Sequence, residues 1–248
     1  MHRIAAEGFS EDGWRYERGR AGYPGDAVDW LIDHLRIGPN SRVADVAAGT
    51  GKLTRELAGR CLLLAVEPVP QMHEVLREVT EVPVVEAVAE HLPFADATFD
   101  AITIAQALHW FDRERAGNEL HRLLKPGTRL GLIWNARDRS HPVVDALWSI
   151  LDEIESDAPW RQERARSTNA IPGFGPDNRQ DFTQVVETTR QGVEDRMLSV
   201  SYISVLAPDK RTEVLAECRA VWDHHLGPEV ESFPFPYRVE AYWLERLD

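Results

Sequence analysis

The segment 42–54 constrains the fold of this chain more than any other part of it. It begins as an apolar run, turns at Gly49 and Gly51, and continues as the start of a helix. Small residues at such a turn let a ligand approach the backbone closely, and the free N–H groups at the helix start point toward that ligand. Glu67 follows a second apolar run, residues 62–66, where an acid can accept both hydroxyl hydrogens of a ribose. The order strand, turn, helix, strand, acid predicts a nucleoside-binding α/β domain.

Apolar runs and helical patterns alternate through the first half of the chain. Apolar strands separated by helices are typical of a parallel sheet that is covered on both faces. After residue 137 the pattern changes: a helix begins at Pro142, no clear period is visible over 157–181, and a strand near 182–190 and a helix over 209–225 follow. Alternating apolar residues in the last strand are typical of a half-exposed antiparallel edge. In the first half we expect strands over 42–48, 61–67, 83–88, 99–107 and 128–136, and helices over 51–59, 70–79 and 112–124, preceded by a helix that Asp26 caps.

Charge and composition limit the partners of the chain. The formal net charge of −13 opposes binding to nucleic acid, because phosphate contacts dominate that affinity. No apolar stretch reaches the about 18 residues of a membrane span, and the first residues are too short and polar a stretch for a secretory signal. Cys61 and Cys218 lack the spacing of a disulfide or zinc motif. We therefore expect a cytoplasmic protein that binds neither nucleic acid nor a membrane.

Two common nucleotide-binding motifs do not fit the glycine turn. A phosphate loop of the G-x-x-x-x-G-K-[ST] type requires Gly at position 46 and Ser or Thr at position 53, where this chain has Val46 and Leu53. A dinucleotide fingerprint, G-x-G-x-x-G, requires a third glycine at the position of Thr54.

Four segments, in order along the chain, resemble the motifs of class I methyltransferases that bind S-adenosylmethionine, of the type called methyltransferase domain 11. The first, residues 43–54, is similar to D-x-G-x-G-x-G, with Ala47 in place of the first glycine. A methyl group is tolerable there if φ is negative. The others are residues 65–68 (ribose-binding acid), 89–100 (adenine loop and fourth strand) and 119–127 (helix and turn before the fifth strand). A narrower resemblance, to small-molecule methyltransferases related to trans-aconitate methyltransferase, rests on residues 16–24, 105–111 and 132–135.

The resemblance implies the architecture. It predicts a Rossmann-like, doubly wound α/β sheet of seven strands, mostly parallel, with an antiparallel C-terminal edge strand and a helical insertion after the fifth strand. Residues 1–40 are expected to form a helical cap of the same domain, 41–137 the cofactor-binding core, 138–181 a lid of helix and loop, and 182–248 the remainder of the domain.

The resemblance also assigns the residues that bind S-adenosylmethionine. Backbone N–H groups of the glycine turn would meet its methionine and ribose portions, Asp45 would accept from its ammonium group, and Glu67 would hold the ribose. Arg20 would pair with a carboxylate, either that of the cofactor or that of an acidic substrate. The expected cofactor-binding residues are Tyr16, Arg20, Asp45, Ala47, Gly49, Thr50, Gly51, Glu67, Pro68, Met72, Ala89, Glu90 and Gln106.

His109 is the candidate catalytic residue. It follows the fourth strand, where parallel sheets place ligand chemistry, and its pKa near neutrality suits a base toward a hydroxyl or an amine. Its alternative role is to position the substrate. No metal is expected, because the chain lacks the carboxylates of catechol-type enzymes at this point. The expected substrate-binding residues are Tyr23, His109, Trp110, Trp134, Asn135 and Arg137.

These observations predict methyl transfer to an oxygen, a carboxylate or a hydroxyl, of a small molecule. A carboxylate acceptor requires no base, whereas a hydroxyl acceptor requires one. Two alternatives stay open: an NAD-dependent oxidoreductase, and a protein of this fold that binds the cofactor without methyl transfer. The identity of the acceptor and the oligomeric state do not follow from the sequence.

Overall fold

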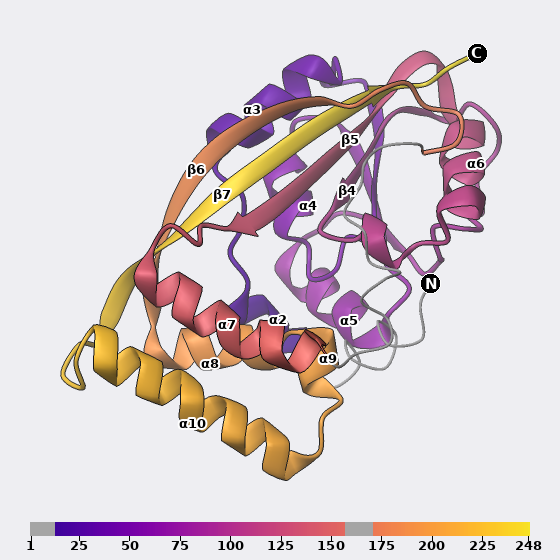
Figure 1. Cartoon of the computed structure of the whole chain (residues 1–248). Helices are drawn as coiled ribbons and strands as arrows, with labels where there is room; N and C mark the ends of the chain where they lie inside the picture. The colour runs from indigo at the N-terminus through magenta and orange to yellow at the C-terminus, as the bar shows by residue number, and fades with distance from the viewer. Residues whose placement is uncertain (1–12, 157–170) are drawn as a thin grey trace.

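The computed structural model describes residues 13–156 and 171–248. In these residues the chain forms one seven-stranded sheet in the order β3-β2-β1-β4-β5-β7-β6, with helices on both faces (Figure 1). The predicted Rossmann-like α/β class is confirmed. The expected cap over 1–40 and lid over 138–181 lie partly outside the described residues, at 1–12 and 157–170.

The five strands β1 to β5 run parallel, and β1 pairs with β2 on one side and β4 on the other. β7 is antiparallel to both of its neighbours, as predicted for the C-terminal strand, but β6 lies outside it and forms the edge of the sheet. The third strand is much shorter than the expected 83–88. The strands are β1 Arg42–Val46, β2 Leu62–Val66, β3 Val84–Val85, β4 Phe99–Ala105, β5 Leu124–Arg137, β6 Asn178–Thr189 and β7 Ser232–Glu245.

The helices predicted from apolar periodicity are present, and α5 has the predicted bounds. Two others, α8 and α9, lie where the sequence predicts no helix. On α8 the buried positions include Glu194, Asp195 and Arg196, so that its apolar residues form no stripe with a helical period. The helices are α2 Gly13–Gly19, α3 Gly25–His34, α4 Lys52–Leu57, α5 Pro70–Val79, the 3-10 helix η1 Leu108–Trp110, α6 Arg113–Leu123, α7 Pro142–Ser156, α8 Arg190–Leu198, α9 Ser201–Ser204 and α10 Pro208–His225.

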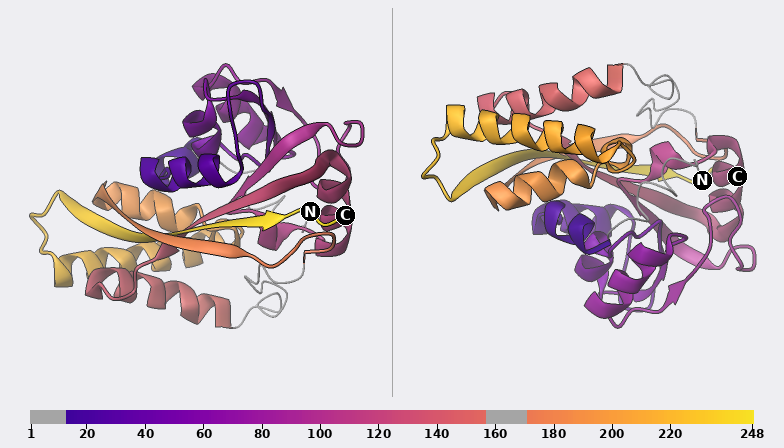
Figure 2. Two further views of the ribbon diagram at one scale, coloured as in Figure 1. Left: turned by 90° about the horizontal axis from the view of Figure 1, so that it is seen from above. Right: turned by 90° about the horizontal axis from the view of Figure 1, so that it is seen from below.

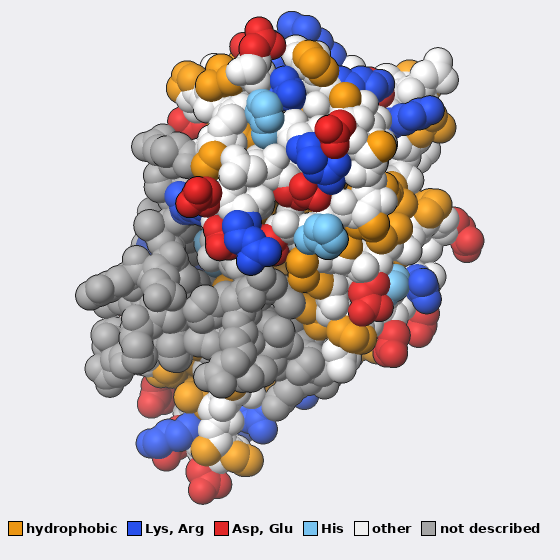
Figure 3. All heavy atoms as spheres, turned by 90° about the vertical axis from the view of Figure 1, so that its right-hand side faces the viewer, with side chains coloured by type: hydrophobic (Ala, Val, Ile, Leu, Met, Phe, Trp, Pro, Cys, Tyr) orange, Lys and Arg blue, Asp and Glu red, His pale blue; other side chains and the backbone are white. Residues whose placement is uncertain are grey.

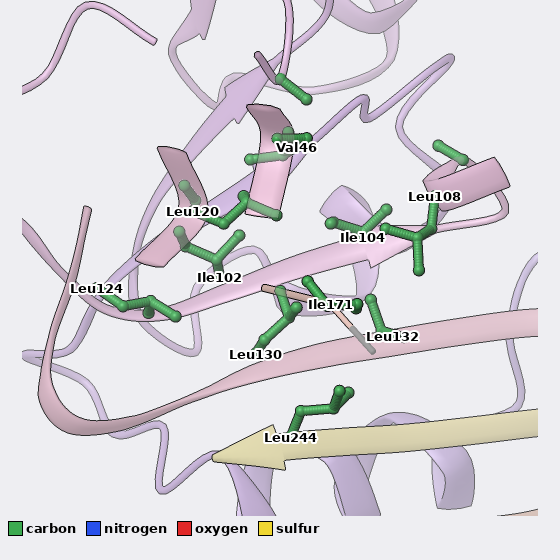
Figure 4. Packing of buried hydrophobic residues seen from close by; sticks show 14 of the residues in the cluster. Val46, Ile102, Ile104, Leu108, Leu120, Leu124, Leu130, Leu132, Ile171 and Leu244 are labelled. Atoms are coloured by element: carbon green, nitrogen blue, oxygen red, sulfur yellow. The ribbon is translucent and has the colours of Figure 1, made fainter. Parts of the chain in front are cut away.

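Alternate residues of the central strands pack into two apolar clusters on opposite faces of the sheet. Val43 and Ala101 face α3 and α4, whereas Ala44 and Ile102 face α6. Figure 4 shows the cluster beside α6, where Leu120 points from that helix toward Ile102. These clusters hold the carboxyl ends of β1, β2 and β4 in fixed positions relative to one another.

A third apolar cluster joins α7, α8, α9 and α10 to the outer part of β7, around Trp148, Trp222 and Phe235. These helices gather beyond the end of β5, beside α2 (Figures 1 and 2). α2 lies in direct backbone contact with α8, because a Cβ atom on Gly19 would stand 2.5 Å from the carbonyl carbon of Asp195. The helical layer therefore reaches the carboxyl edge of the parallel strands.

Among the described residues, no helix combines the length and the apolar composition that crossing a bilayer requires. On the face drawn in Figure 3, outside the grey atoms, Lys and Arg side chains are interspersed with Asp and Glu rather than gathered into one basic patch.

Candidate active site

The loop between β1 and α4 has a left-handed backbone at three residues: Ala47 (φ 55°), Gly49 (φ 60°) and Gly51 (φ 85°). A side chain at Gly51 would be strained by the positive φ and would force Leu76 on α5 to move, because its Cβ would lie 2.4 Å from Cδ1 of Leu76. The negative φ that would make the methyl group of Ala47 tolerable is not found. An alanine in this conformation stores backbone strain, and strain of this kind is commonly held at ligand sites.

Asp45 is completely buried beneath this loop. Its Oδ2 accepts a hydrogen bond from the hydroxyl of Thr54 (2.6 Å) and its Oδ1 one from Thr103 (2.9 Å). Burial raises the pKa of Asp45 to about 6, although both hydrogen bonds act to lower it. Asp45 thus ties the loop and α4 to β4. It lines neither of the two cavities described below, so contact with a cofactor ammonium group stays a prediction.

Glu67 stands at the end of β2, where its side chain joins the loop to the start of α5. It is 4% exposed, with Oε2 accepting from the Gly49 N–H (2.7 Å) and Oε1 from the Val69 N–H (2.8 Å). Burial raises its pKa to about 7 against the effect of these hydrogen bonds. A carboxylate offers about four acceptor positions, so both oxygens can accept a further donor. Glu67 can therefore hold two neighbouring hydroxyl groups.

The first cavity lies over the carboxyl ends of β1, β2 and β4 and measures about 610 Å³ with its open mouth included. Its wall is mainly apolar, and Glu67, Glu90 and Gln106 add polar groups. A mainly apolar wall with a few polar groups is usual for a small-molecule site. The lining residues are Tyr16, Ala47, Gly49, Glu67, Pro68, Val69, Met72, Val88, Ala89, Glu90, Ala105, Gln106, Ala107, Trp110 and Phe111.

The second cavity, of about 480 Å³, meets the first at Tyr16, Ala47, Gly49, Ala105 and Gln106. It is lined by three basic side chains, those of Arg20, Lys52 and Arg196, whereas no Lys or Arg is among the described residues that line the first cavity. The other lining residues are Arg20, Ala21, Tyr23, Ala48, Thr50, Lys52, Leu53, Asn135, Arg196 and Tyr237.

Glu17 fixes α2 over the glycine turn. Its Oε1 accepts from Lys52 (2.9 Å) and from Arg55 (2.8 Å), and its Oε2 accepts from the hydroxyl of Thr50 (2.6 Å). This cluster explains why Tyr16 and Arg20, from the N-terminal part of the chain, lie beside residues of the Rossmann-like core.

Most of the residues predicted for the site converge on these two cavities. The exceptions among the cofactor residues are Asp45, described above, and Gly51, which packs against α5. Those that line a cavity are Tyr16, Arg20, Tyr23, Ala47, Gly49, Thr50, Glu67, Pro68, Met72, Ala89, Glu90, Gln106, Trp110 and Asn135.

Three residues predicted to bind substrate lie elsewhere. His109 lies on η1 with its ring centroid 4.7 Å from that of Trp110 and lines neither cavity, so its catalytic role stays a prediction. Trp134 is part of the core and packs edge-on against Tyr242. The guanidinium carbon of Arg137 lies 5.0 Å from the ring centroid of Trp148.

Three residues that line the second cavity are not among those predicted from the sequence: Lys52, Arg196 and Tyr237. Lys52 could have been found, because it follows Gly51 directly. No motif in the sequence indicates that Arg196 and Tyr237 belong to the site. Both lie far along the chain, and only the packing of α8 against α2 and the pairing of β7 with β5 bring them there.

We expect Ala47→Gly to raise the free energy of unfolding, by about 0–1.5 kcal/mol. Removing the methyl relieves about 1–2 kcal/mol of left-handed strain, and the greater freedom of glycine in the unfolded chain offsets about 0.5–1 kcal/mol of that gain. Urea unfolding measures the difference. Ala48→Gly is the matched control: Ala48 has no positive φ, so this change should only destabilise. Equal losses of stability in both variants would contradict the strain at Ala47.

The buried carboxyl groups predict that the ligand-free protein loses stability as the pH rises. A glutamic acid with a usual pKa of 4.5 titrates at about 7 as Glu67 in the folded chain. Between these values the folded state keeps a proton that the unfolded state releases, so the free energy of unfolding falls with increasing pH. Asp45, shifted from 3.8 to about 6, acts in the same direction. Melting temperatures taken from about pH 5 to 8 should decline less in Glu67→Gln than in the wild type, and superimposable curves would contradict the shift at Glu67.

Comparison with known proteins identifies the class. Residues 44–132 match the model of a family described as a methyltransferase domain. An uncharacterised methyltransferase of Mycobacterium tuberculosis is 38% identical over 212 residues, 85% of this chain and 83% of that protein. An uncharacterised methyltransferase-like protein of Schizosaccharomyces pombe is 33% identical over 224 residues, 87% of this chain and 86% of that protein.

The chain therefore belongs to the methyltransferase family. Its fold is shared with the solved structure of a candidate type II methyltransferase from Anaeromyxobacter dehalogenans, at a TM-score of 0.61 and 22% identity, over 92% of this chain and 97% of the other. The narrower resemblance to trans-aconitate methyltransferases stays a prediction.

Proposed function

We propose that this methyltransferase takes its methyl group from S-adenosylmethionine and transfers it to an oxygen of a small molecule. The position of Glu67 carries the proposal. Its carboxyl group is buried at the end of β2, bonded to the glycine turn through the Gly49 N–H, and open to the first cavity. An acid placed in this way is suited to a ribose diol.

The first cavity fits the adenosyl part of this cofactor. Pro68, Val69 and Met72 give an apolar wall beside Glu67 for a flat base, and Ala89 and Glu90 lie where they can meet its polar edge. The methionine part would extend past Gly49 into the second cavity. When bound, S-adenosylmethionine would supply a methyl carbon whose bond to the positively charged sulfur breaks when a nucleophile attacks it.

The second cavity favours a carboxylate oxygen as the nucleophile. Its described lining contains no His, Asp or Glu side chain that could remove a proton from a hydroxyl or an amine. A carboxylate needs no such base, and Arg20 and Lys52 offer positive charge near it. The protein would then act mainly by holding the carboxylate oxygen and the methyl group in the orientation for reaction. Such orientation can lower the barrier by about 7–11 kcal/mol.

A transfer assay tests this function. The protein is incubated with S-adenosylmethionine labelled in its methyl group and a panel of small carboxylic acids and phenols. We expect labelled products that release methanol in mild alkali, as methyl esters do. Binding of NAD⁺ without any binding of S-adenosylhomocysteine would instead favour an oxidoreductase. Binding of S-adenosylhomocysteine without transfer to any compound would favour a protein that only binds the cofactor.

A further inference from the structure

Arg196 presents a buried positive charge to the helical side of the site. Its side chain lies on α8, the residue is 8% exposed, and its Nη1 has no hydrogen-bond partner among the described residues. The guanidinium carbon lies 5.3 Å from the ring centroid of Trp148, so an aromatic face is its neighbour. A buried charge is costly unless it is paired, so a buried guanidinium group with an unsatisfied donor is suited to an anionic ligand that would complete its hydrogen bonds.

The cationic neighbours of Arg196 increase this need for an anion. Arg20 donates from Nε and Nη2 to the hydroxyl and carbonyl oxygens of Ser199, both at 2.9 Å. Burial, followed by the charge of Arg196, lowers the pKa of Arg20 to about 9, and Arg137 acts in the same direction. Three guanidinium groups thus lie close enough to repel one another.

The two acidic residues of α8 that lie next to Arg196 in the sequence are paired with other arginines. Asp195 is bonded to Arg18 at 3.0 Å, and Glu194 is bonded to Arg219 at 2.7 Å. Asp152 lies 3.9 Å from Arg137, at the limit of an ion pair. Glu187 is the one acid among the described residues that line the cavity beside Arg196, and its side chain is exposed to solvent.

That cavity, the third cavity, has room for an organic ligand. It measures about 620 Å³ with its open mouth included and shares Arg20, Ala21, Arg196 and Tyr237 with the second cavity. Its remaining wall is mixed: Trp148 and Phe235 form an aromatic part, and charged and hydroxyl side chains form another. The other lining residues are Arg18, Gly19, Trp148, Val186, Glu187, Thr188, Thr189, Gly192, Val193 and Phe235.

We propose that Arg196, together with Arg20, binds a carboxylate or phosphate group of the methyl acceptor, and that an apolar part of the same molecule packs against Trp148 and Phe235 in the third cavity. The acceptor class is therefore an organic anion with an apolar body. This inference rests on the proposed function, because it concerns the molecule that receives the methyl group. Arg196 is a specificity-determining residue in this account, and the anion completes its hydrogen bonds.

Calorimetry on the full chain, saturated with S-adenosylhomocysteine, tests the site with three probes that share a phenyl ring. Benzoate and phenyl phosphate carry the anion, and benzamide is neutral. We expect at least one anion to bind about tenfold or more tightly than benzamide, since hydrogen bonds to charged groups are the stronger ones. Equal binding of all three probes, or no binding of either anion, would overturn the inference. This comparison needs no variant, so it does not depend on the folding of one.

The substitution Arg196→Met keeps the length of the side chain and removes its charge. It should weaken binding of the anionic probe about tenfold or more, weaken binding of S-adenosylhomocysteine less than it weakens binding of the probe, and leave the melting temperature equal or higher, because an unpaired buried charge is gone. Arg190→Met, at the other end of α8 and bonded to Asp223, is the matched control and should leave both affinities unchanged.

Other outcomes separate this inference from the proposed function. If Arg196→Met weakens S-adenosylhomocysteine and not the anionic probe, Arg196 holds the carboxylate of the cofactor and the acceptor site is refuted. If its melting temperature falls and anion binding is retained, Arg196 is a structural residue. If wild-type protein does not bind S-adenosylhomocysteine at all, the proposed function fails first.

Discussion

Glu67→Ala should weaken the binding of S-adenosylhomocysteine by about 100-fold or more. The carboxylate is expected to accept two ribose hydroxyl hydrogens, and a hydrogen bond to a charged group is worth about 1.5–3 kcal/mol. The same change removes the acceptor of the Gly49 and Val69 N–H groups, which loosens the glycine turn that the cofactor would contact. Titration calorimetry at about pH 8, where Glu67 is ionised, measures the loss.

Two further variants make this result interpretable. Glu56→Ala, on the exposed face of α4, removes an acid outside the cavities and should bind as the wild type does. Glu67→Gln keeps the shape and one acceptor oxygen, so its affinity should fall between those of the wild type and Glu67→Ala. A folded Glu67→Ala protein that binds within about threefold of the wild type would show that the ribose lies elsewhere.

Trp148→Ala should lower the free energy of unfolding by about 3–5 kcal/mol, the usual result of truncating a fully buried aromatic side chain. Trp148 is completely buried, packs against Phe235, and provides the aromatic face for both Arg137 and Arg196. Urea unfolding followed by circular dichroism measures the change.

The control for this prediction is Trp14→Ala. Trp14 is 42% exposed on α2, and its removal should change the stability by less than about 1 kcal/mol. If Trp148→Ala were as mild as Trp14→Ala, the cluster around α7, α8 and α10 would not be the tightly packed layer described here.

The Rossmann-like core could be predicted because its signals are local. β1 and β2 are continuous apolar runs, and α5 has a regular apolar face beginning at Pro70. Glu67 could be placed because an acid directly after a buried strand must lie at the carboxyl edge of the sheet. The order of β6 and β7 could not be derived in this way, because both strands alternate polar and apolar residues and either could be the edge.

The helical side of the site could not be predicted for a different reason. Arg196 reaches the site through contacts between residues far apart in the sequence, and α8 lacks the apolar stripe that reveals a helix. Ala47 has a left-handed backbone, which alanine disfavours, so the geometry of the turn overrides the preference of the residue. A position after a parallel strand does not by itself place a side chain in a cavity. His109 follows β4 as expected, yet it lines neither of the cavities that meet at Gln106.

The most direct test is a crystal structure of the full chain with S-adenosylhomocysteine. We predict that the adenosyl group fills the first cavity, with both ribose hydroxyls hydrogen-bonded to Glu67 and the base beside Met72. Density for the ligand outside this cavity, or a Glu67 side chain turned away from the sugar, would contradict the central claim that the crevice above β1 and β2 holds the methyl donor.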